Sequence, residues 1–334
     1  MTTPRITVLG SGSVGLAVAA TYARAGVDVT LLARGSAVQQ LRRSGITVTG
    51  VAGDHDIGPE RLKISDAESP DPEDIGCDCL IVATKAYQVR EALRGLAQWM
   101  SAAAVPRAVL LLQNGWGSAD DARDVLPAGV AIFSSIMMIG IERRTPTHVH
   151  VNVQASPVRV GTLFSAPSHE MRAIVERGQT GFLPILYEED IEPAILDKFL
   201  FNTCLNALGA STRMTYGELV SNAHTRHLIA HIADETIRLV REERGRVLAA
   251  SGTAYVEKSL TPFVIPKAAA HRSSMLQDVE AGRRTEIDYL NGAVVRMGRS
   301  RGIETPFNDA VASLIGAREA GGISAPWPRA LAER

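Results

Sequence analysis

The sequence has few cysteines, no excess of charge of either sign and no long hydrophobic run, and each shortage excludes a class of protein. It holds 35 lysine and arginine residues against 36 aspartate and glutamate residues, so its net charge of −1 gives no sign of a nucleic-acid or anionic-membrane partner. No apolar run is long enough to span a bilayer, and the first one leads into a glycine loop rather than a signal-peptide pattern. We therefore expect a cytoplasmic protein that binds neither nucleic acid nor membrane.

The three cysteines match neither a disulfide framework nor a metal site. Cys77 and Cys79 lie two residues apart on a predicted strand, and Cys204 lies in a predicted helix. A C-x-C pair has neither redox nor zinc-site spacing, so we expect buried, reduced thiols. No cluster of histidine, cysteine and carboxylate residues has metal-ligand spacing, and we predict no metal.

The chain has no internal repeat, low-complexity stretch or long linker, and its 334 residues are enough for two domains. The first half alternates strand-like and helix-like segments. Residues 131–161 are rich in Val, Ile and Thr, which predicts extra strands at one edge of a sheet. From about residue 191 the apolar residues follow a helical period, which predicts helices at Glu192–Leu208, Thr225–Ala250, Met275–Arg284 and Thr285–Arg301.

A glycine loop lies between the first predicted strand, Arg5–Leu9, and a predicted helix, Leu16–Arg24, and a second strand follows at Val27–Leu32. The pattern G-x-G-x-x-G in this setting is typical of dinucleotide binding. Its glycines allow a tight turn, a close approach of the pyrophosphate and close packing of the helix, whose free N–H groups attract phosphate. The predicted cofactor-binding residues here are Gly10, Ser11, Gly12, Ser13, Val14 and Gly15.

The end of the second predicted strand indicates which dinucleotide binds. An NAD site usually carries Asp or Glu there to bond the ribose hydroxyls. This chain has no acid at that point, and Arg34 occupies the position. A guanidinium can pair with a 2′-phosphate through two hydrogen bonds, which favours NADP(H). The alternative is a solvated surface arginine.

Polar residues also end two further predicted strands, Cys77–Thr84 and Ala108–Leu112. Lys85 and Gln88 follow the first strand, and Asn114 follows the second. Ligands of open α/β sheets bind beyond the carboxyl ends of the strands, so these three residues are candidates for a cofactor or substrate cleft. Each is also a common turn residue, and Asn114 is followed by glycine in a turn pair.

A polar stripe runs along the predicted helix Glu192–Leu208. Lys198, Asn202 and Asn206 are spaced i, i+4 and i+8 and therefore share one face, whereas the other faces are apolar. Buried amides and an ammonium need partners, because an unpaired amide costs about 1–3 kcal/mol. A small anionic or carbonyl-bearing substrate could supply them, and so could a structural polar network. The stripe alone leaves both interpretations open.

Three segments together resemble the ketopantoate reductase family: the loop GSGSVG, the helix KFLFNTCLNAL and the late segment SSMLQDVEAGRRTEIDYLNG. The resemblance covers nearly the whole chain, including TKAYQ and QNGWG at the strand ends. It implies an α/β fold with a Rossmann-type parallel-sheet domain at 1–188, an all-helical domain at 189–334 and an active site between them. It also implies NADPH as hydride donor and a 2-oxo acid as substrate, and it leaves a homodimer open as the assembly.

The resemblance implies a role for each candidate. Lys198 would be the catalytic residue at the substrate carbonyl, and Glu286 would bond to the substrate hydroxyl and orient Lys198. Ser274 would hold the substrate carboxylate. The remaining substrate-binding residues would be Asn114, Asn202 and Asn206, and the cofactor would contact Arg34, Lys85 and Asn114. Gln88, from its place after the strand, is a further predicted cofactor contact.

Two residues depart from the family pattern, and one assignment has an alternative. His271 stands where members more often carry a small polar residue, and Tyr216 stands where some carry Asn. Both lie near the expected substrate end and bear on the substrate rather than on the reaction type. Glu286 could instead be an exposed carboxylate at a helix start with Thr285 as N-cap.

The leading hypothesis is an NADPH-dependent reductase of 2-dehydropantoate, which would serve pantothenate biosynthesis. The same hydride chemistry on a different 2-oxo acid is the alternative, because a fold and a cofactor site do not fix the substrate. A third hypothesis is a non-catalytic NADP-binding protein. Lys198 paired with Glu286 argues against it, since a binding module needs no proton donor.

Overall fold

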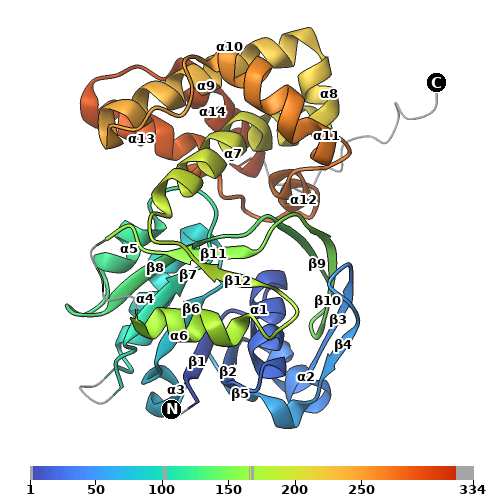
Figure 1. The fold of residues 1–334 in the computed structure, drawn as a ribbon, viewed down its shortest axis with the longest axis vertical. Coiled ribbons are helices and arrows are strands. Elements are labelled where there is room, and N and C mark those ends of the chain that lie inside the picture. The colour runs from blue at the N-terminus through green and yellow to red at the C-terminus, as the bar shows by residue number, and fades with distance from the viewer. Residues whose placement is uncertain (1–2, 101–103, 165, 167–168, 321–334) are drawn as a thin grey trace. The chain divides into compact units, whose positions relative to one another are not determined.

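The computed structural model describes residues 3–100, 104–164, 166 and 169–320, and the chain divides into two compact units (Figure 1). The first unit comprises Met1–Gln113 and Gly117–Glu192. The second comprises Asn114–Trp116 and Pro193–Arg334. No helix in the described ranges is both long enough and apolar enough to cross a membrane.

The first unit is built on an eight-stranded sheet of order β12-β11-β8-β7-β6-β1-β2-β5. Neighbouring strands are parallel except β11 and β8, which are antiparallel. The predicted parallel α/β sheet is thus confirmed. The strands are β1 (Arg5–Leu9), β2 (Asp28–Ala33), β5 (Lys63–Asp66), β6 (Cys79–Val82), β7 (Ala108–Leu111), β8 (Ala131–Ile136), β11 (Val158–Gly161) and β12 (Ile185–Tyr187).

The central strands are buried on both faces, and their side chains divide between two cores. Ile6 and Val8 of β1 pack in one hydrophobic cluster, whereas Leu9 packs in another, as the alternation of side chains along a strand requires. Helices α1 (Ser13–Arg24) and α6 (His169–Gly178) contribute to the first cluster, and α4 (Val89–Ala97) and α5 (Ser118–Arg123) to the second. The remaining helical segments of this unit are α2 (Ser36–Ser44), η1 (Pro59–Arg61), α3 (Pro72–Ile75) and η2 (Ala86–Gln88).

The prediction of strands for residues 131–161 is confirmed, but the predicted place at the edge of the sheet holds for only two of them. All four segments are strands, but only β8 and β11 join the large sheet. β9 (Ile139–Thr145) and β10 (His148–Gln154) form a second sheet with β3 (Ile46–Gly50) and β4 (His55–Ile57). Val, Ile and Thr favour a strand without naming its partner, and β10 pairs with β3, a strand about 100 residues earlier.

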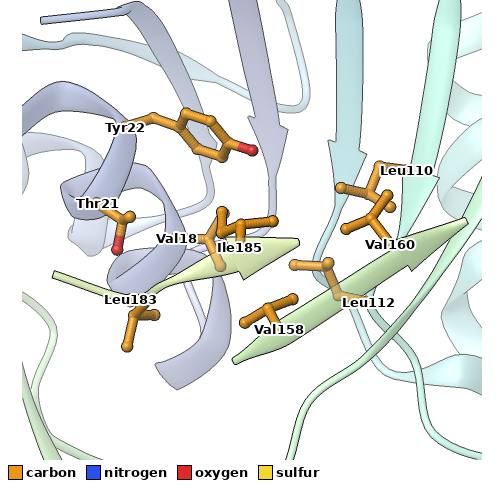
Figure 2. Close-up of a pocket in the computed structure, with 9 residues that line it drawn as sticks. All are labelled: Val18, Thr21, Tyr22, Leu110, Leu112, Val158, Val160, Leu183 and Ile185. Carbon is orange, nitrogen blue, oxygen red and sulfur yellow. The ribbon is translucent and has the colours of Figure 1, made fainter. Parts of the chain in front are cut away.

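A small cavity lies inside the first core, and it is a packing gap. Figure 2 shows its nine lining residues, and none is a predicted site residue. Tyr22 is fully buried there, its hydroxyl has no hydrogen-bond partner in the described part of the chain, and burial raises its pKa. The lining residues come from α1, β7, β11, β12 and the chain near them: Val18, Thr21, Tyr22, Leu110, Leu112, Val158, Val160, Leu183 and Ile185.

The described part of the second unit is helical, as predicted. α9 ends earlier than expected because Gly245, at φ 65°, turns the chain into the left-handed region. The helix predicted at Thr285–Arg301 is interrupted at Leu290, which has non-helical angles (φ −111°, ψ −106°). The elements are α7 (Glu192–Thr212), α8 (Tyr216–Ser221), α9 (Ala223–Arg244), α10 (Gly252–Tyr255), η3 (Val256–Val264), α11 (Ile265–Ala268), α12 (Ser274–Glu280), η4 (Ile287–Tyr289), α13 (Asn291–Arg301) and α14 (Pro306–Ala320).

A buried polar network joins four of these helices and fixes α7 among them. The Glu235 carboxylate on α9 accepts from the backbone N–H groups of Phe307 (2.8 Å) and Asn308 (2.9 Å) at the start of α14. Asn291 on α13 donates to the Asn308 side-chain oxygen (2.9 Å) and to the Thr203 carbonyl of α7 (3.0 Å). These bonds satisfy groups that would be costly to bury alone.

Candidate functional site

The glycine loop joins β1 to α1, and two of its glycines are required by the fold itself. Gly10 has φ +112°, and its N–H donates to the Leu32 carbonyl of β2 (3.1 Å). A Cβ on Gly15 would lie 1.9 Å from the Gly10 carbonyl oxygen, so only glycine allows α1 to start this close to β1. The geometry therefore matches the tight turn and close helix packing that the motif predicts.

Gly12 differs from the other two, because nothing in the protein requires it. A Cβ there would meet no atom within 4 Å, and its φ of −73° suits any residue. Gly12 is the N-cap of α1, and no side chain caps this helix. The open space lies at a helix start, where N–H groups without intrahelical partners favour an anion.

The other predicted cofactor residues follow neighbouring strands of the same unit. Arg34 is exposed directly after β2. Lys85 is half-buried after β6, at the N-cap of η2. The exposed Gln88 side chain accepts a hydrogen bond from the Lys85 backbone N–H (3.2 Å), so part of its role is to cap this turn. Since β2, β1 and β6 are parallel neighbours, their carboxyl ends lie along one edge of the sheet.

Arg143 reaches the glycine loop and was not predicted from the sequence. Its guanidinium donates to the Ser11 carbonyl (3.2 Å) from β9 of the second sheet. The two residues are 132 positions apart, and no local pattern links them. The sequence gives no signal beyond an arginine in a strand, because the pairing of β9 could not be predicted.

The polar stripe lies on α7, the long yellow-green helix of the second unit (Figure 1). Asn202 and Asn206 are buried, at 6% and 4% exposure, and Lys198 is half-buried. The Phe199, Leu200 and Leu205 side chains pack in the core on the other faces of the helix. The spacing argument therefore predicted both the shared face and the burial of the two amides.

Burial and one nearby carboxylate set the charge of Lys198. Burial lowers the pKa of Lys198 to about 8, and the charge of Glu286 opposes that shift. Glu286 is itself buried, at 8% exposure, and accepts a weak hydrogen bond from the Asn114 amide nitrogen (3.4 Å). The alternative of an exposed helix-start carboxylate is wrong, because the chain turns through η4 and keeps Glu286 inside.

Asn114 reaches Glu286 because the short segment Asn114–Trp116 is fastened to η4. The Trp116 N–H donates to the Tyr289 carbonyl (2.8 Å). Gly115 has φ +89°, and a Cβ there would lie 2.1 Å from the same Tyr289 oxygen, so only glycine fits. Trp116 also packs near Phe199 of α7, with ring centroids 6.3 Å apart. The Asn114-Gly115 pair is a turn, and it also brings an amide to the carboxylate.

The two asparagines of α7 keep hydrogen-bonding capacity that the described residues do not use. Asn206 accepts from the Tyr216 hydroxyl through its side-chain oxygen (2.8 Å). Its nitrogen, and both amide atoms of Asn202, make no hydrogen bond in the ranges that the structure describes, yet none is among the buried polar atoms without a partner. These atoms are therefore accessible, and the stripe is not a closed structural network.

Ser273 and Ser274 have different positions at the start of α12. Ser273 is fully buried, accepts from the Leu276 N–H (3.0 Å) and donates to the Asn206 carbonyl (3.2 Å). Ser274 is exposed at the first helical position. The cap function thus falls to Ser273, which leaves the Ser274 hydroxyl available.

The candidates divide between the two units according to their predicted roles. The glycine loop, Arg34, Lys85 and Gln88 lie in the first unit, and the catalytic and substrate candidates lie in the second. Asn114, predicted for both roles, belongs to the second unit with Lys198 and Glu286. No group of three or more histidine, cysteine, aspartate and glutamate residues in the described chain could hold a metal ion, and all three cysteines are buried and free.

Known proteins resemble the chain over nearly its whole length. The family descriptions "Ketopantoate reductase PanE/ApbA" and "Ketopantoate reductase PanE/ApbA C terminal" match residues 6–163 and 190–319. A 2-dehydropantoate 2-reductase of Aquifex aeolicus is 30% identical over 317 residues, covering 93% of this chain and 96% of the relative. One from Archaeoglobus fulgidus is 30% identical over 325 residues, covering 96% and 100%.

Solved structures agree with the fold. A PanE/ApbA family ketopantoate reductase from Ralstonia eutropha has a TM-score of 0.81 and 25% identity, covering 95% of this chain and 99% of that chain. A D-mandelate dehydrogenase solved with NADH and anilino(oxo)acetate has the same TM-score at 24% identity, covering 95% and 98%, and shares the fold. On the sequence relatives and the two family matches, this chain belongs to the ketopantoate reductase family.

Proposed function

We propose that the protein is an NADPH-dependent reductase of a 2-oxo acid, with 2-dehydropantoate as its substrate. The observation that carries the proposal is Lys198, a half-buried ammonium with a pKa of about 8 beside the accessible amides of Asn202 and Asn206. The names of the relatives support this substrate, since both sequence relatives described above are named 2-dehydropantoate 2-reductase. We propose that the reaction takes place in the cytoplasm.

The side chains of the second unit suit the reduction of a carbonyl. Negative charge develops on the carbonyl oxygen, and the Lys198 ammonium can stabilise that charge and deliver a proton to the oxygen. Glu286 keeps part of the Lys198 population charged despite desolvation. Ser274 is the proposed anchor of the carboxylate, and Asn202 and Asn206 are donors for the rest of the substrate.

The first unit suits a dinucleotide, which supplies the hydride when bound. The open space at Gly12 admits a pyrophosphate against the start of α1, and Gly10 and Gly15 hold the loop in the required shape. Arg34 and Lys85 are proposed cofactor contacts, with Gln88 beside them. The NADH in the D-mandelate dehydrogenase structure supports a nicotinamide cofactor. The choice of NADPH rests on Arg34.

A different 2-oxo acid is the second candidate, and one observation favours it. The ring of Tyr216 packs against Phe201 and His271, so aromatic surface adjoins Asn206. The likeness in fold to a D-mandelate dehydrogenase bound to anilino(oxo)acetate is in keeping with an aromatic substrate. A non-catalytic NADP-binding protein is the third candidate and would show no turnover.

The substrate is tested by steady-state kinetics with NADPH and three oxo acids. We expect kcat/KM for 2-dehydropantoate to exceed that for 2-oxoisovalerate, which has the branch but no hydroxymethyl group, by up to about 10⁴–10⁵-fold. The reason is that donors built for a hydroxyl are left unpaired by an analogue that lacks it. A better rate with a phenyl-substituted oxo acid would replace 2-dehydropantoate by the second candidate, and no turnover with any of them would favour the third.

The cofactor preference is tested with Arg34→Ala. The intact protein should use NADPH better than NADH, and the substitution should narrow the ratio of the two kcat/KM values by about 10–150-fold. The loss of a charge-assisted hydrogen bond to the 2′-phosphate is the cause. Arg177→Ala, which removes an exposed arginine on α6, is the control. Equal kcat/KM values of the intact protein for both cofactors would contradict the assignment.

The proton donor is tested with Lys198→Ala. We expect kcat to fall by about 10²–10⁴-fold, because the variant cannot stabilise or protonate the developing oxyanion. The dissociation constant of NADPH, measured by fluorescence titration, should change little. Lys258→Ala removes an exposed lysine of the same unit and serves as the control. A folded Lys198→Ala variant with normal turnover would make Lys198 a structural residue.

The pH dependence follows from the lowered pKa of Lys198. A proton donor acts in its charged form, which predominates below its pKa, so kcat/KM for reduction should fall as the pH rises through about 8. Glu286→Gln removes the charge that raises this pKa, and the fall should then begin at a lower pH. Profiles between about pH 6 and 10 measure the shift. Glu304→Gln, an exposed carboxylate, should leave the profile in place, and an unshifted profile for Glu286→Gln would exclude the coupling.

A further inference from the structure

Tyr216 is buried against Asn206, and the reaction outlined above gives it no role. It is 3% exposed, and its hydroxyl donates to the Asn206 side-chain oxygen at 2.8 Å, with both groups inside the second unit. The two residues lie on different helices, α8 and α7. A buried hydrogen bond between side chains of two helices fixes the position of both.

The chain holds Tyr216 in place from both sides. Arg213 adopts a left-handed conformation (φ 64°) after α7, and its guanidinium pairs with Glu280 of α12 (3.1 Å). Thr215 and Glu218 cap the start of α8 reciprocally. The Tyr216 N–H donates to the His271 carbonyl (3.1 Å). The hydroxyl therefore meets Asn206 at a fixed point.

This bond determines which atom of Asn206 remains for a ligand. The side-chain oxygen is occupied by the hydroxyl, so the nitrogen remains, and it is accessible. A reversed amide would donate to the Tyr216 oxygen and leave the hydroxyl proton buried without a partner, which is unfavourable. Asn206 is thus held as a hydrogen-bond donor.

The ring of Tyr216, whose hydroxyl holds this donor, packs against two other aromatic rings. The Tyr216 ring meets Phe201 edge to face, with centroids 5.4 Å apart, and lies 5.0 Å from the ring of His271. Burial lowers the pKa of His271 and so favours the neutral form of this ring. One fixed donor suits a substrate that presents a single acceptor oxygen at this point.

We propose that Tyr216 is a positioning residue that selects the substrate by holding the Asn206 amide nitrogen toward an oxygen at the end of the substrate remote from the reacting carbonyl. Asn206 lies eight residues from Lys198 on the same helix, which is roughly 12 Å along the axis. A substrate whose carbonyl lies at Lys198 would therefore meet Asn206 with its other end. The substrate class is a 2-oxo acid whose branched apolar chain bears one hydroxyl. This inference rests on the proposed function.

The test compares kcat/KM for 2-dehydropantoate and for 2-oxoisovalerate, with NADPH, in the intact protein and in Tyr216→Phe. The substitution keeps the ring and removes the hydroxyl, so the Asn206 amide is free to turn. We expect the ratio of the two kcat/KM values to fall about 3–10-fold, with the loss confined to the hydroxylated substrate. A merely structural role would lower both values by the same factor and leave the ratio unchanged.

Two further variants sharpen the comparison. Asn206→Asp retains an oxygen that accepts from Tyr216 but has no N–H to donate, and we expect the ratio to fall about 10–100-fold. It carries the test alone if Tyr216→Phe does not fold. Tyr255→Phe removes the hydroxyl of another buried tyrosine in the same hydrophobic cluster and should leave the ratio unchanged.

The outcomes separate this inference from the proposed function. An unchanged ratio in Tyr216→Phe or Asn206→Asp, in a protein that reduces 2-dehydropantoate, would overturn this inference alone. An intact protein that reduces both oxo acids equally well would also overturn it, while leaving a 2-oxo acid reductase. An intact protein that reduces neither would overturn the proposed function and this inference with it.

Discussion

The cost of burying polar groups on an otherwise apolar helix governs the second unit. α7 packs on its remaining faces in the hydrophobic core, so Asn202 and Asn206 of the stripe are buried with it and Lys198 is half-buried. An ammonium and two amides in such a place require partners. Glu286 provides a charge for Lys198, and Tyr216 provides a donor for one amide oxygen. The turn at η4, the Asn114–Trp116 segment and the start of α8 are arranged around these two contacts.

The fold and part of the site could be predicted because their signals are local. Spacing placed Lys198, Asn202 and Asn206 on one face, and the glycine pattern in its strand–loop–helix setting predicted the shape of the loop. The β-branched composition of residues 131–161 predicted strands correctly. Each of these inferences needs only neighbours in the sequence and the geometry of a helix or a strand.

The parts of the fold and of the site that could not be predicted depend on contacts between residues far apart in the sequence. Arg143 lies 132 positions from Ser11, and its strand belongs to a sheet that composition could not assign. The helix predicted at Thr285–Arg301 breaks at Leu290, whereas the turn-like pair Asn291-Gly292 that follows lies inside α13, and Glu286 before the break is buried. The sequence distinguishes Tyr216 only as a departure from the family pattern. Its bond to Asn206 joins two helices, and Arg213 between them adopts a left-handed conformation that is rare for residues other than glycine.

The three glycines of the loop obey different constraints, and this separates folding from binding. The fold itself requires glycine at both Gly10 and Gly15. Gly10 has a positive φ, and a Cβ atom on Gly15 would overlap the Gly10 carbonyl oxygen. Gly12 has an ordinary φ and open space where a side chain would be. A descendant of this protein that no longer bound a dinucleotide would still have to keep Gly10 and Gly15 in order to fold, whereas position 12 would be free to drift. In a related sequence, the residue at position 12 therefore indicates whether the loop is still selected to bind a ligand.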